Sequence, residues 1–228
     1  MKLVDVFNRL LEMNLNVFQT SDVMAYLTIP APHASILLRR LTDAGQLINL
    51  RRGIWAIPGK TDPLALPEIL TRPFPSYVSL QTALYHHGLI TQIPSVIYAI
   101  SLARTRVYKT QVGEFSIHHI EPSFFFGFES TGDHGVNMAI PEKALLDTLY
   151  LSPAKSNLFH SLPEIEFPKN FDFDLALRII RRIPFRSRRA LIERAFNRLI
   201  ENCIKEGSLK IEVSAGTANG KQRYRAIS

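Results

Sequence analysis

Three short amphipathic segments fill the first 45 residues, and none of them is long enough to bury a core alone. In the first, apolar residues recur three and four positions apart, which predicts a helix over residues 2–13. A second short helix is expected over residues 21–27. Pro32 suits the first turn of a third helix over residues 32–44, and Gly45 provides its stop. The pattern therefore predicts three helices that pack on one another.

The third predicted helix has a polar face opposite its apolar one. Because successive helical residues turn by roughly 100°, Ala34 and Leu37 fall on one side. Ser35, Arg39 and Thr42 project from the opposite side. Hydroxyl and guanidinium groups on an exposed helix face are the groups that read base edges and phosphates.

A basic hairpin is expected directly after this helix. Strand-like runs at residues 46–50 and 54–57 flank Arg51-Arg52-Gly53, and Gly53 can adopt the positive φ of a tight turn. Three helices followed by an arginine-tipped hairpin predict a winged helix-turn-helix over residues 1–60. Helical trios are also common in domains that do not bind DNA, and some winged helices bind proteins.

We expect the third helix to enter a major groove and the hairpin tip to contact the backbone of double-stranded DNA. The predicted DNA-binding residues are His33, Ser35, Arg39, Arg40, Thr42, Arg51 and Arg52.

The distribution of charge agrees with polyanion contacts at both ends. The chain of 228 residues has a formal net charge of +7. Residues 1–60 carry a net +3, residues 61–174 a net −5 and residues 175–228 a net +9. An unevenly charged solvated surface is the ordinary alternative.

Residues 61–155 predict a mixed α/β domain, which makes the whole chain α+β. Runs rich in β-branched and aromatic residues predict strands, and periodic segments predict helices. The expected strands are 97–102, 105–109, 115–120 and 135–139, and the expected helices are 79–87 and 141–150. The aromatic run 124–128 is interpreted as core rather than as a base-stacking platform.

Three segments in this order carry a family resemblance. They are Arg51-Arg52-Gly53-Ile54-Trp55-Ala56-Ile57-Pro58, Tyr77-Val78-Ser79-Leu80-Gln81-Thr82-Ala83-Leu84-Tyr85-His86-His87-Gly88-Leu89 and Ala139-Ile140-Pro141-Glu142-Lys143-Ala144-Leu145-Leu146-Asp147. Over roughly its first 155 residues the chain resembles the AbiEi-like antitoxins of type IV toxin–antitoxin systems, which act in abortive phage infection.

The resemblance implies an N-terminal DNA-binding domain that represses its own operon. It also implies a middle region that neutralises a nucleotidyltransferase-like toxin, without requiring a stable complex with it. From the residues alone, Glu142 is explained by the first turn of a helix, where a carboxylate is favourable. Lys143 is expected to be solvated or to pair with Asp147, worth tenths of a kcal/mol.

Residues 156–228 predict a basic helical region with a terminal hairpin around residues 209–227. Two amphipathic helices are expected, over residues 175–183 and 187–205. Their arginines are interpreted as a solvated face, a supplementary phosphate-binding surface or an interface for an acidic partner, and we favour the second. The supplementary phosphate-binding candidates are Arg181, Arg182, Arg186, Arg188, Arg189, Arg194 and Arg198.

The sequence does not favour an enzyme. The paired histidines diverge, so neither pair forms a chelate, and no zinc-protease, phosphate-loop or nucleophile-elbow motif occurs. We therefore expect no catalytic residue, no metal and no cofactor. A metal-dependent nuclease is the remaining enzymatic alternative, with Glu114, Glu129 and Asp133 as its carboxylates. A free-standing transcriptional regulator without a toxin is the other alternative to the antitoxin.

Composition bounds the location. The single cysteine, Cys203, fits a reducing compartment, and no apolar run has membrane-spanning length. The residues after Met1 also lack the long apolar core of a signal peptide. We expect a cytoplasmic protein with no membrane partner, and the sequence leaves its oligomeric state open.

Overall fold

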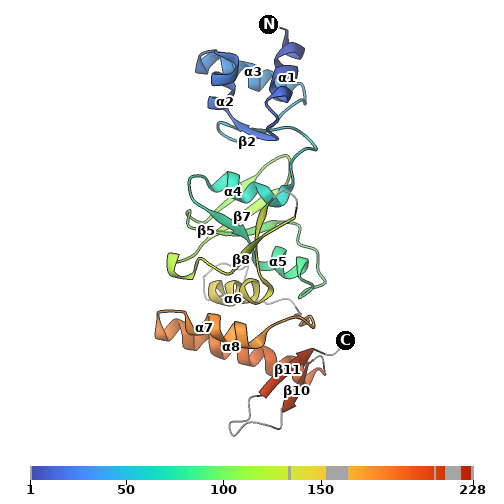
Figure 1. The fold of residues 1–228 in the computed structure, drawn as a ribbon, viewed down its shortest axis with the longest axis vertical. Helices are drawn as coiled ribbons and strands as arrows, with labels where there is room; N and C mark the ends of the chain where they lie inside the picture. Colours follow the sequence, from blue (N-terminus) through green and yellow to red (C-terminus); the bar gives the residue numbers. More distant parts are fainter. Residues whose placement is uncertain (1, 133–134, 153–163, 208, 214–221, 227–228) are drawn as a thin grey trace.

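The chain extends along one long axis, with its first helices at one end and its last strands at the other (Figure 1). The computed structural model describes residues 2–132, 135–152, 164–207, 209–213 and 222–226. Helices and strands are mixed throughout, so the predicted combination of α and β structure is confirmed.

Three helices and a small antiparallel sheet form the N-terminal end. The elements are α1 (Leu3–Glu12), β1 (Val17–Gln19), α2 (Thr20–Leu27), α3 (Ala31–Asp43), β2 (Ile48–Arg51) and β3 (Ile54–Ala56). The sheet has the order β1-β3-β2. The helices begin and end within two residues of their predicted bounds, because the apolar spacing and Pro32 define them. The strand β1 was not predicted, since three residues are too few to show alternation.

One apolar cluster holds these helices together. Val6 and Leu10 of α1 are buried against Leu38 and Leu41 of α3, with Phe18 of β1 beside them. The apolar stripe identified in the sequence is therefore the buried side of α3, which leaves its polar side outside.

A six-stranded mixed sheet forms the middle of the molecule. Its strands are β4 (Ser76–Val78), β5 (Ile97–Ser101), β6 (Arg106–Lys109), β7 (Glu114–His119), β8 (Phe128–Thr131) and β9 (Val136–Ala139). Their order is β6-β7-β5-β4-β9-β8, with β4–β9 and β5–β7 parallel. Two 3₁₀ turns, η1 (Pro63–Ala65) and η2 (Pro122–Phe124), and the helices α4 (Leu66–Thr71) and α5 (Leu80–His86) connect the strands. Neither β4 nor β8 was predicted.

A helical layer follows the sheet. The helix α6 (Pro141–Leu151) lies between the sheet and the pair α7 (Phe173–Arg181) and α8 (Arg186–Lys205) (Figure 1). Phe124 is fully buried in the core that these elements share, so the interpretation of the aromatic run as core is confirmed there. The predicted terminal hairpin is also confirmed: β10 (Leu209–Val213) pairs antiparallel with β11 (Gln222–Ala226). Residues 219–220, its proposed turn, lie outside the described residues.

The N-terminal sheet packs directly on the middle part. Leu50 and Ile54 from β2 and β3 share a buried cluster with Leu66 and Leu70 of α4 and with Phe115 of β7. This contact places α4 against the hairpin formed by β2 and β3 (Figure 1).

Candidate nucleic-acid interface

A hollow of about 510 Å³ lies between α3 and the β2–β3 hairpin. It is lined by Thr20, Ser35, Arg39, Thr42, Asn49, Arg52, Gly53 and Trp55. Four of the predicted DNA-binding residues are thus brought together, three from α3 and one from the hairpin. The other four, Thr20, Asn49, Gly53 and Trp55, were not among the predicted DNA-binding residues.

The residues from α3 reach the hollow along one edge of its polar face. Ser35 and Arg39 are exposed, whereas Thr42 is half-buried. The Thr42 hydroxyl donates to the Leu38 carbonyl at 3.0 Å, so its proton is already used within the helix. Ser35 and Arg39 are therefore the α3 side chains whose donors are available to a ligand.

The hairpin turn is held in place by polar contacts on both sides. Thr20 N–H donates to the Gly53 carbonyl at 3.0 Å, and the Trp55 indole N–H donates to the Thr20 hydroxyl at 3.0 Å. The Asn49 amide donates to the carbonyls of Arg51 and Ile54 at 3.2 and 3.4 Å. Gly53 has φ of 80°, the left-handed conformation predicted for this position. The turn that carries Arg52 is thus fixed relative to α2.

Arg51 does not line the hollow. It was predicted to contact DNA beside Arg52, but its Nη2 donates to the Arg72 carbonyl at 3.3 Å, and its Nε is buried with no hydrogen-bond partner among the described residues. Arg51 is the last residue of β2, whereas Arg52 belongs to the turn that follows and lines the hollow. Arg51 instead joins the hairpin to the end of α4.

His33 and Arg40 are exposed on α3 but do not line the hollow. With about 100° per residue, they fall on the flank of α3 opposite to Ser35 and Thr42. The structure therefore divides the predicted α3 residues between two flanks, and Arg39 belongs to the one that faces the hairpin.

The cations of the hollow have no carboxylate partner among the described residues. The ion pairs of the described residues are Lys109–Glu114, Lys143–Asp147 and Arg178–Asp172. None of them includes Arg39 or Arg52. Two unpaired guanidinium groups converging with a serine hydroxyl and an asparagine form a site suited to a polyanion that also offers hydrogen-bonding edges.

The C-terminal arginines lie at the other end of the molecule, on α7 and α8 (Figure 1). The Arg188 guanidinium lies 4.3 Å from the Tyr150 ring centroid and donates to the Tyr150 carbonyl. Arg182 lies 3.6 Å from the Phe126 ring centroid while remaining exposed. Both guanidinium groups thus help to attach the C-terminal helices to the aromatic core.

Arg189 and Arg194 donate to helix carbonyls, those of Arg181 and Ala190. The remaining candidates, Arg181, Arg186 and Arg198, are exposed. The predicted supplementary surface is therefore not adjacent to the hollow, and a part of it serves packing.

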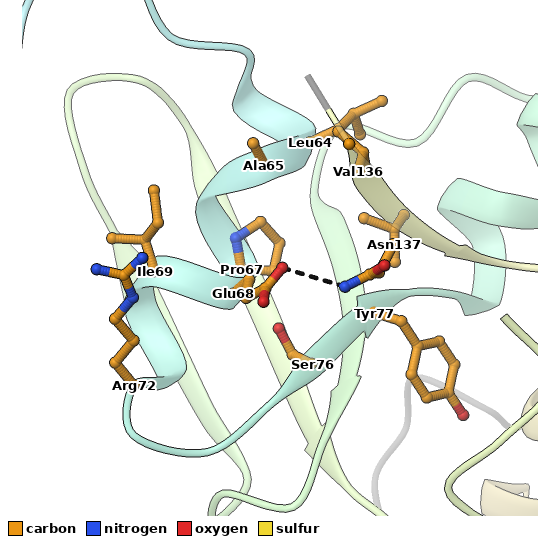
Figure 2. Close-up of a pocket in the computed structure, with 12 residues that line it drawn as sticks. Leu64, Ala65, Pro67, Glu68, Ile69, Arg72, Ser76, Tyr77, Val136 and Asn137 are labelled. Atoms are coloured by element: carbon orange, nitrogen blue, oxygen red, sulfur yellow. Dashed lines mark hydrogen bonds between the residues drawn. The ribbon is translucent and has the colours of Figure 1, made fainter. Parts of the chain in front are cut away.

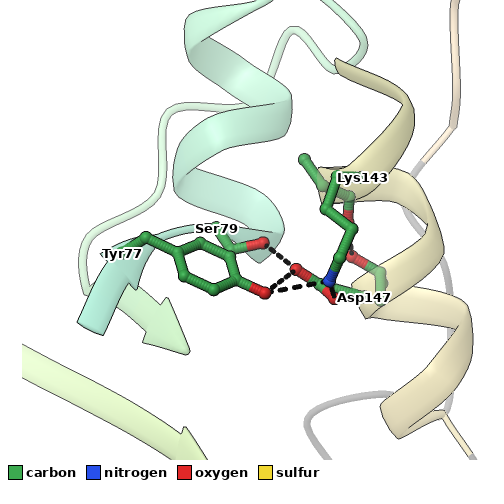
Figure 3. Close-up of polar contacts among 6 residues, drawn as sticks. Tyr77, Ser79, Lys143 and Asp147 are labelled. Carbon is green, nitrogen blue, oxygen red and sulfur yellow. Dashed lines mark hydrogen bonds and ion pairs between the residues drawn. The ribbon is translucent and has the colours of Figure 1, made fainter. Parts of the chain in front are cut away.

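A buried polar network joins β4 and the residue that follows it to α6 (Figure 3). Asp147 accepts hydrogen bonds from Ser79 at 2.8 Å and from Tyr77 at 3.0 Å, and it forms an ion pair with Lys143. The Lys143 ammonium also donates to the Tyr77 hydroxyl at 2.9 Å and lies 4.2 Å from the Phe124 ring centroid. Sequence reasoning allowed the pair but treated it as exposed, which was wrong.

The network has no access to solvent. Lys143 and Asp147 are both fully buried. Burial lowers the pKa of Lys143 and raises the pKa of Asp147, and their pairing opposes both shifts. These buried groups are partnered with one another, so the network is a structural attachment of α6 to β4.

Asp172 caps α7, and Glu142 holds Asp172 in place. The Glu142 carboxylate accepts the Asp172 backbone N–H at 2.6 Å, and burial is the main cause of its raised pKa. The Asp172 carboxylate accepts the Leu175 N–H at 2.8 Å at the start of α7.

The nuclease carboxylates do not come together. Glu114 lies on β7 and Glu129 on β8, and three strands separate β7 from β8 in the sheet. Asp133 lies outside the described residues. No group of three or more His, Cys, Asp or Glu side chains that could hold a metal ion occurs in the part of the chain that the structure describes.

None of the helices in the described ranges has the length and apolar character needed to cross a bilayer. Comparison with known proteins does not assign the chain to a family: no family model matches it, and no curated protein does.

Proposed function

We propose that this protein is a DNA-binding transcriptional regulator whose residues 1–60 act as a winged helix-turn-helix. One observation carries the proposal: Ser35 and Arg39 of α3 and Arg52 of the hairpin line the same hollow, without a carboxylate partner for either arginine in the described chain. A helix face and an adjacent basic turn are the two parts that such domains apply to a duplex.

In this role α3 enters the major groove with its exposed polar edge. Arg39 donates to the N7 and O6 acceptors of a guanine or to a phosphate, and Ser35 contacts either. Arg52, held by the fixed turn, contacts the neighbouring phosphate strand. Repression follows from occupancy of the promoter, which requires no catalytic step and takes place in the cytoplasm.

The test is fluorescence anisotropy with a duplex from upstream of the protein's own gene, over a salt series. Arg52→Ala removes one phosphate contact, so the log–log slope of affinity against salt should fall by about one. Arg39→Ala should weaken binding to this duplex by about tenfold or more, because a bidentate base contact is worth roughly 1–3 kcal/mol.

Arg104→Ala is the matched control, since Arg104 is an exposed arginine of the middle part. The Arg104→Ala variant should bind the duplex with the affinity and the salt slope of the unaltered protein. Unchanged binding by the Arg39→Ala and Arg52→Ala variants would remove the hollow from the interface.

We further propose that the regulator is the antitoxin of a type IV toxin–antitoxin system and represses its own operon. The support is the resemblance to the AbiEi-like family in residues 77–89 and 139–147, whose side chains Tyr77, Ser79, Lys143 and Asp147 form one buried unit. Co-expression should restore growth of cells that express a nucleotidyltransferase-like protein encoded beside this gene.

A free-standing regulator is the alternative. It predicts no such neighbouring gene and no rescue, together with unchanged DNA binding. Co-expression and the anisotropy measurement therefore separate the two proposals.

A further inference from the structure

A second cleft lies in the middle part, between α4 and the strands β4 and β9 (Figure 2). Its volume is about 220 Å³. One water needs roughly 10–15 Å³ of such space, so the cleft has room for a small solute. Its polar lining comes from Glu68, Arg72, Ser76 and Asn137.

Ser76 is the first reason to expect a ligand. It is 2% exposed, and its hydroxyl is buried without a hydrogen-bond partner among the described residues. Its cross-strand neighbour Ser101 is equally enclosed, but donates to the Pro75 carbonyl at 2.7 Å. A buried hydroxyl that lacks a partner is rare in proteins, and a bound molecule can provide the partner.

The charges around the cleft are the second reason. The Glu68 carboxylate accepts from the Asn137 side-chain amide at 3.2 Å across the cleft (Figure 2). Arg72, at the end of α4, brings a positive charge to the same lining, and Pro67 and Val136 add apolar surface. Charges of opposite sign beside a free hydroxyl are complementary to a small zwitterion.

We propose that this cleft binds a free α-amino acid. Its ammonium group pairs with Glu68, its carboxylate accepts from Ser76 and faces Arg72, and its side chain lies along the apolar wall. The Glu68 carboxylate would repel a simple anion, and the Arg72 guanidinium would repel a simple cation. A zwitterion therefore suits the lining best.

A hydrogen bond connects the cleft to the nucleic-acid interface, beside the apolar contact of Leu50 and Ile54 with α4. The Arg72 carbonyl accepts from Arg51 at 3.3 Å, and Arg51 directly precedes Arg52, which lines the hollow. A ligand that moves Arg72 therefore moves the base of the hairpin. This regulatory step, unlike the binding itself, rests on the proposed DNA-binding function.

Calorimetric titration of the full chain tests the binding with each of the twenty amino acids, and with free nucleobases for comparison. We expect at least one amino acid to bind. Glu68→Gln should weaken its binding by about tenfold or more, because the contact is charge-assisted. Ser76→Ala should weaken it by about threefold to tenfold without lowering the stability of the free protein, since the hydroxyl has no partner to lose.

Glu129→Gln, on an exposed strand position outside the cleft, is the control and should bind as the unaltered protein does. The proposal would be overturned if no amino acid bound, or if nucleobases bound instead. Equal losses of affinity in Glu129→Gln and Glu68→Gln would also overturn it.

Anisotropy with and without the bound amino acid then tests the coupling. The amino acid should change DNA affinity by about fivefold or more, the lower range of allosteric coupling, and Arg51→Ala should abolish the change. Unaltered DNA affinity in the presence of a bound amino acid overturns the coupling alone. Absence of DNA binding in both conditions, with calorimetric binding intact, contradicts the proposed function instead.

Discussion

Two lysine–carboxylate pairs in this chain have the same chemistry in opposite environments. In the pair Lys109–Glu114, at 3.4 Å, the side chains are 80% and 37% exposed, whereas those of Lys143 and Asp147 are fully buried. Water screens the first pair, so it contributes little to stability. In the second pair each charge depends on the other, because no water replaces a missing partner.

Lys143→Met should therefore lower the free energy of unfolding by about 3–5 kcal/mol, the usual cost of removing one partner of a buried pair. Asp147 would keep its hydrogen bonds from Ser79 and Tyr77 but lose its countercharge. Urea denaturation measures the loss. Lys109→Met, as the matched exposed variant, should stay within about 1 kcal/mol of the unaltered protein.

The double variant Lys143→Met/Asp147→Leu shows how much of this loss of stability comes from the uncompensated charge of Asp147. With neither charge left, it should recover a part of the stability lost in Lys143→Met. A double variant that is less stable than the single one would show that the hydrogen bonds from Ser79 and Tyr77 to Asp147 outweigh the cost of its uncompensated charge.

His118 provides a dependence of stability on pH. It is 6% exposed on β7, where it contacts the Ser116 hydroxyl at 2.9 Å, and burial lowers its pKa to about 4 from 6.5. Between these values the unfolded chain binds a proton that the folded chain does not. Stability should therefore fall as the pH falls from 6.5 towards 4, with a loss of about 2 kcal/mol between pH 7 and pH 5.

Urea denaturation at both pH values checks this contribution. His118→Gln should reduce the difference between pH 7 and pH 5 by about 2 kcal/mol. His119→Gln, which alters the exposed neighbour on the same strand, should leave the difference as it is. An unchanged difference in His118→Gln would mean that the buried imidazole is not the source.

At the scale of elements, the hairpin turn depends on a side chain that does not itself carry charge. Asn49 donates to the carbonyls on both sides of Arg52-Gly53, where the register of β2 and β3 shifts. Asn49→Ala should weaken DNA binding by about threefold to tenfold, because a net hydrogen bond is worth roughly 1 kcal/mol and two are lost. The salt slope should stay unchanged, since no cation is removed, whereas Arg52→Ala lowers it.

Elements with a long apolar period could be predicted from the sequence, whereas the strands β1, β4 and β8 could not. Residues 3–12, 31–43 and 186–205 show helical spacing over several turns and form helices near the predicted bounds. The strands β4 and β8 have three and four residues. Every residue of β4 is buried, so no alternation marks it.

The candidate site could be predicted from the sequence where a single helix sets the direction of its side chains. The helical period alone puts Ser35 and Arg39 on the outer side of α3. The roles of Arg51 and Arg188 depend on the contacts of the hairpin with α4 and of α8 with Tyr150, which are tertiary. Sequence reasoning treated every arginine near a turn as exposed, and it missed Asn49 because its hydrogen bonds exist only once the hairpin has formed.

At the scale of the whole molecule, the basic ends are separated by the middle part along the long axis (Figure 1). The N-terminal end carries the hollow with Arg39 and Arg52, and the far end carries the exposed Arg181, Arg186 and Arg198. The net −5 of residues 61–174 lies between them in sequence. A short duplex held in the hollow is therefore not expected to reach α7 and α8.

Comparison of duplex lengths tests this separation. On a duplex of about one helical turn, which is roughly 10 base pairs, the variant Arg181→Ala/Arg186→Ala/Arg198→Ala should bind with the affinity and salt slope of the unaltered protein. Each lost phosphate contact lowers the slope by about one, so a fall of two to three on this short duplex would contradict the separation. On a long duplex, a fall of the same size would mean that the DNA bends and reaches the far end of the molecule. An unchanged slope on both duplexes would mean that these arginines contact an acidic partner and not DNA. Because the total charge removed is the same in both measurements, a difference between the two lengths reports position along the molecule and not net charge.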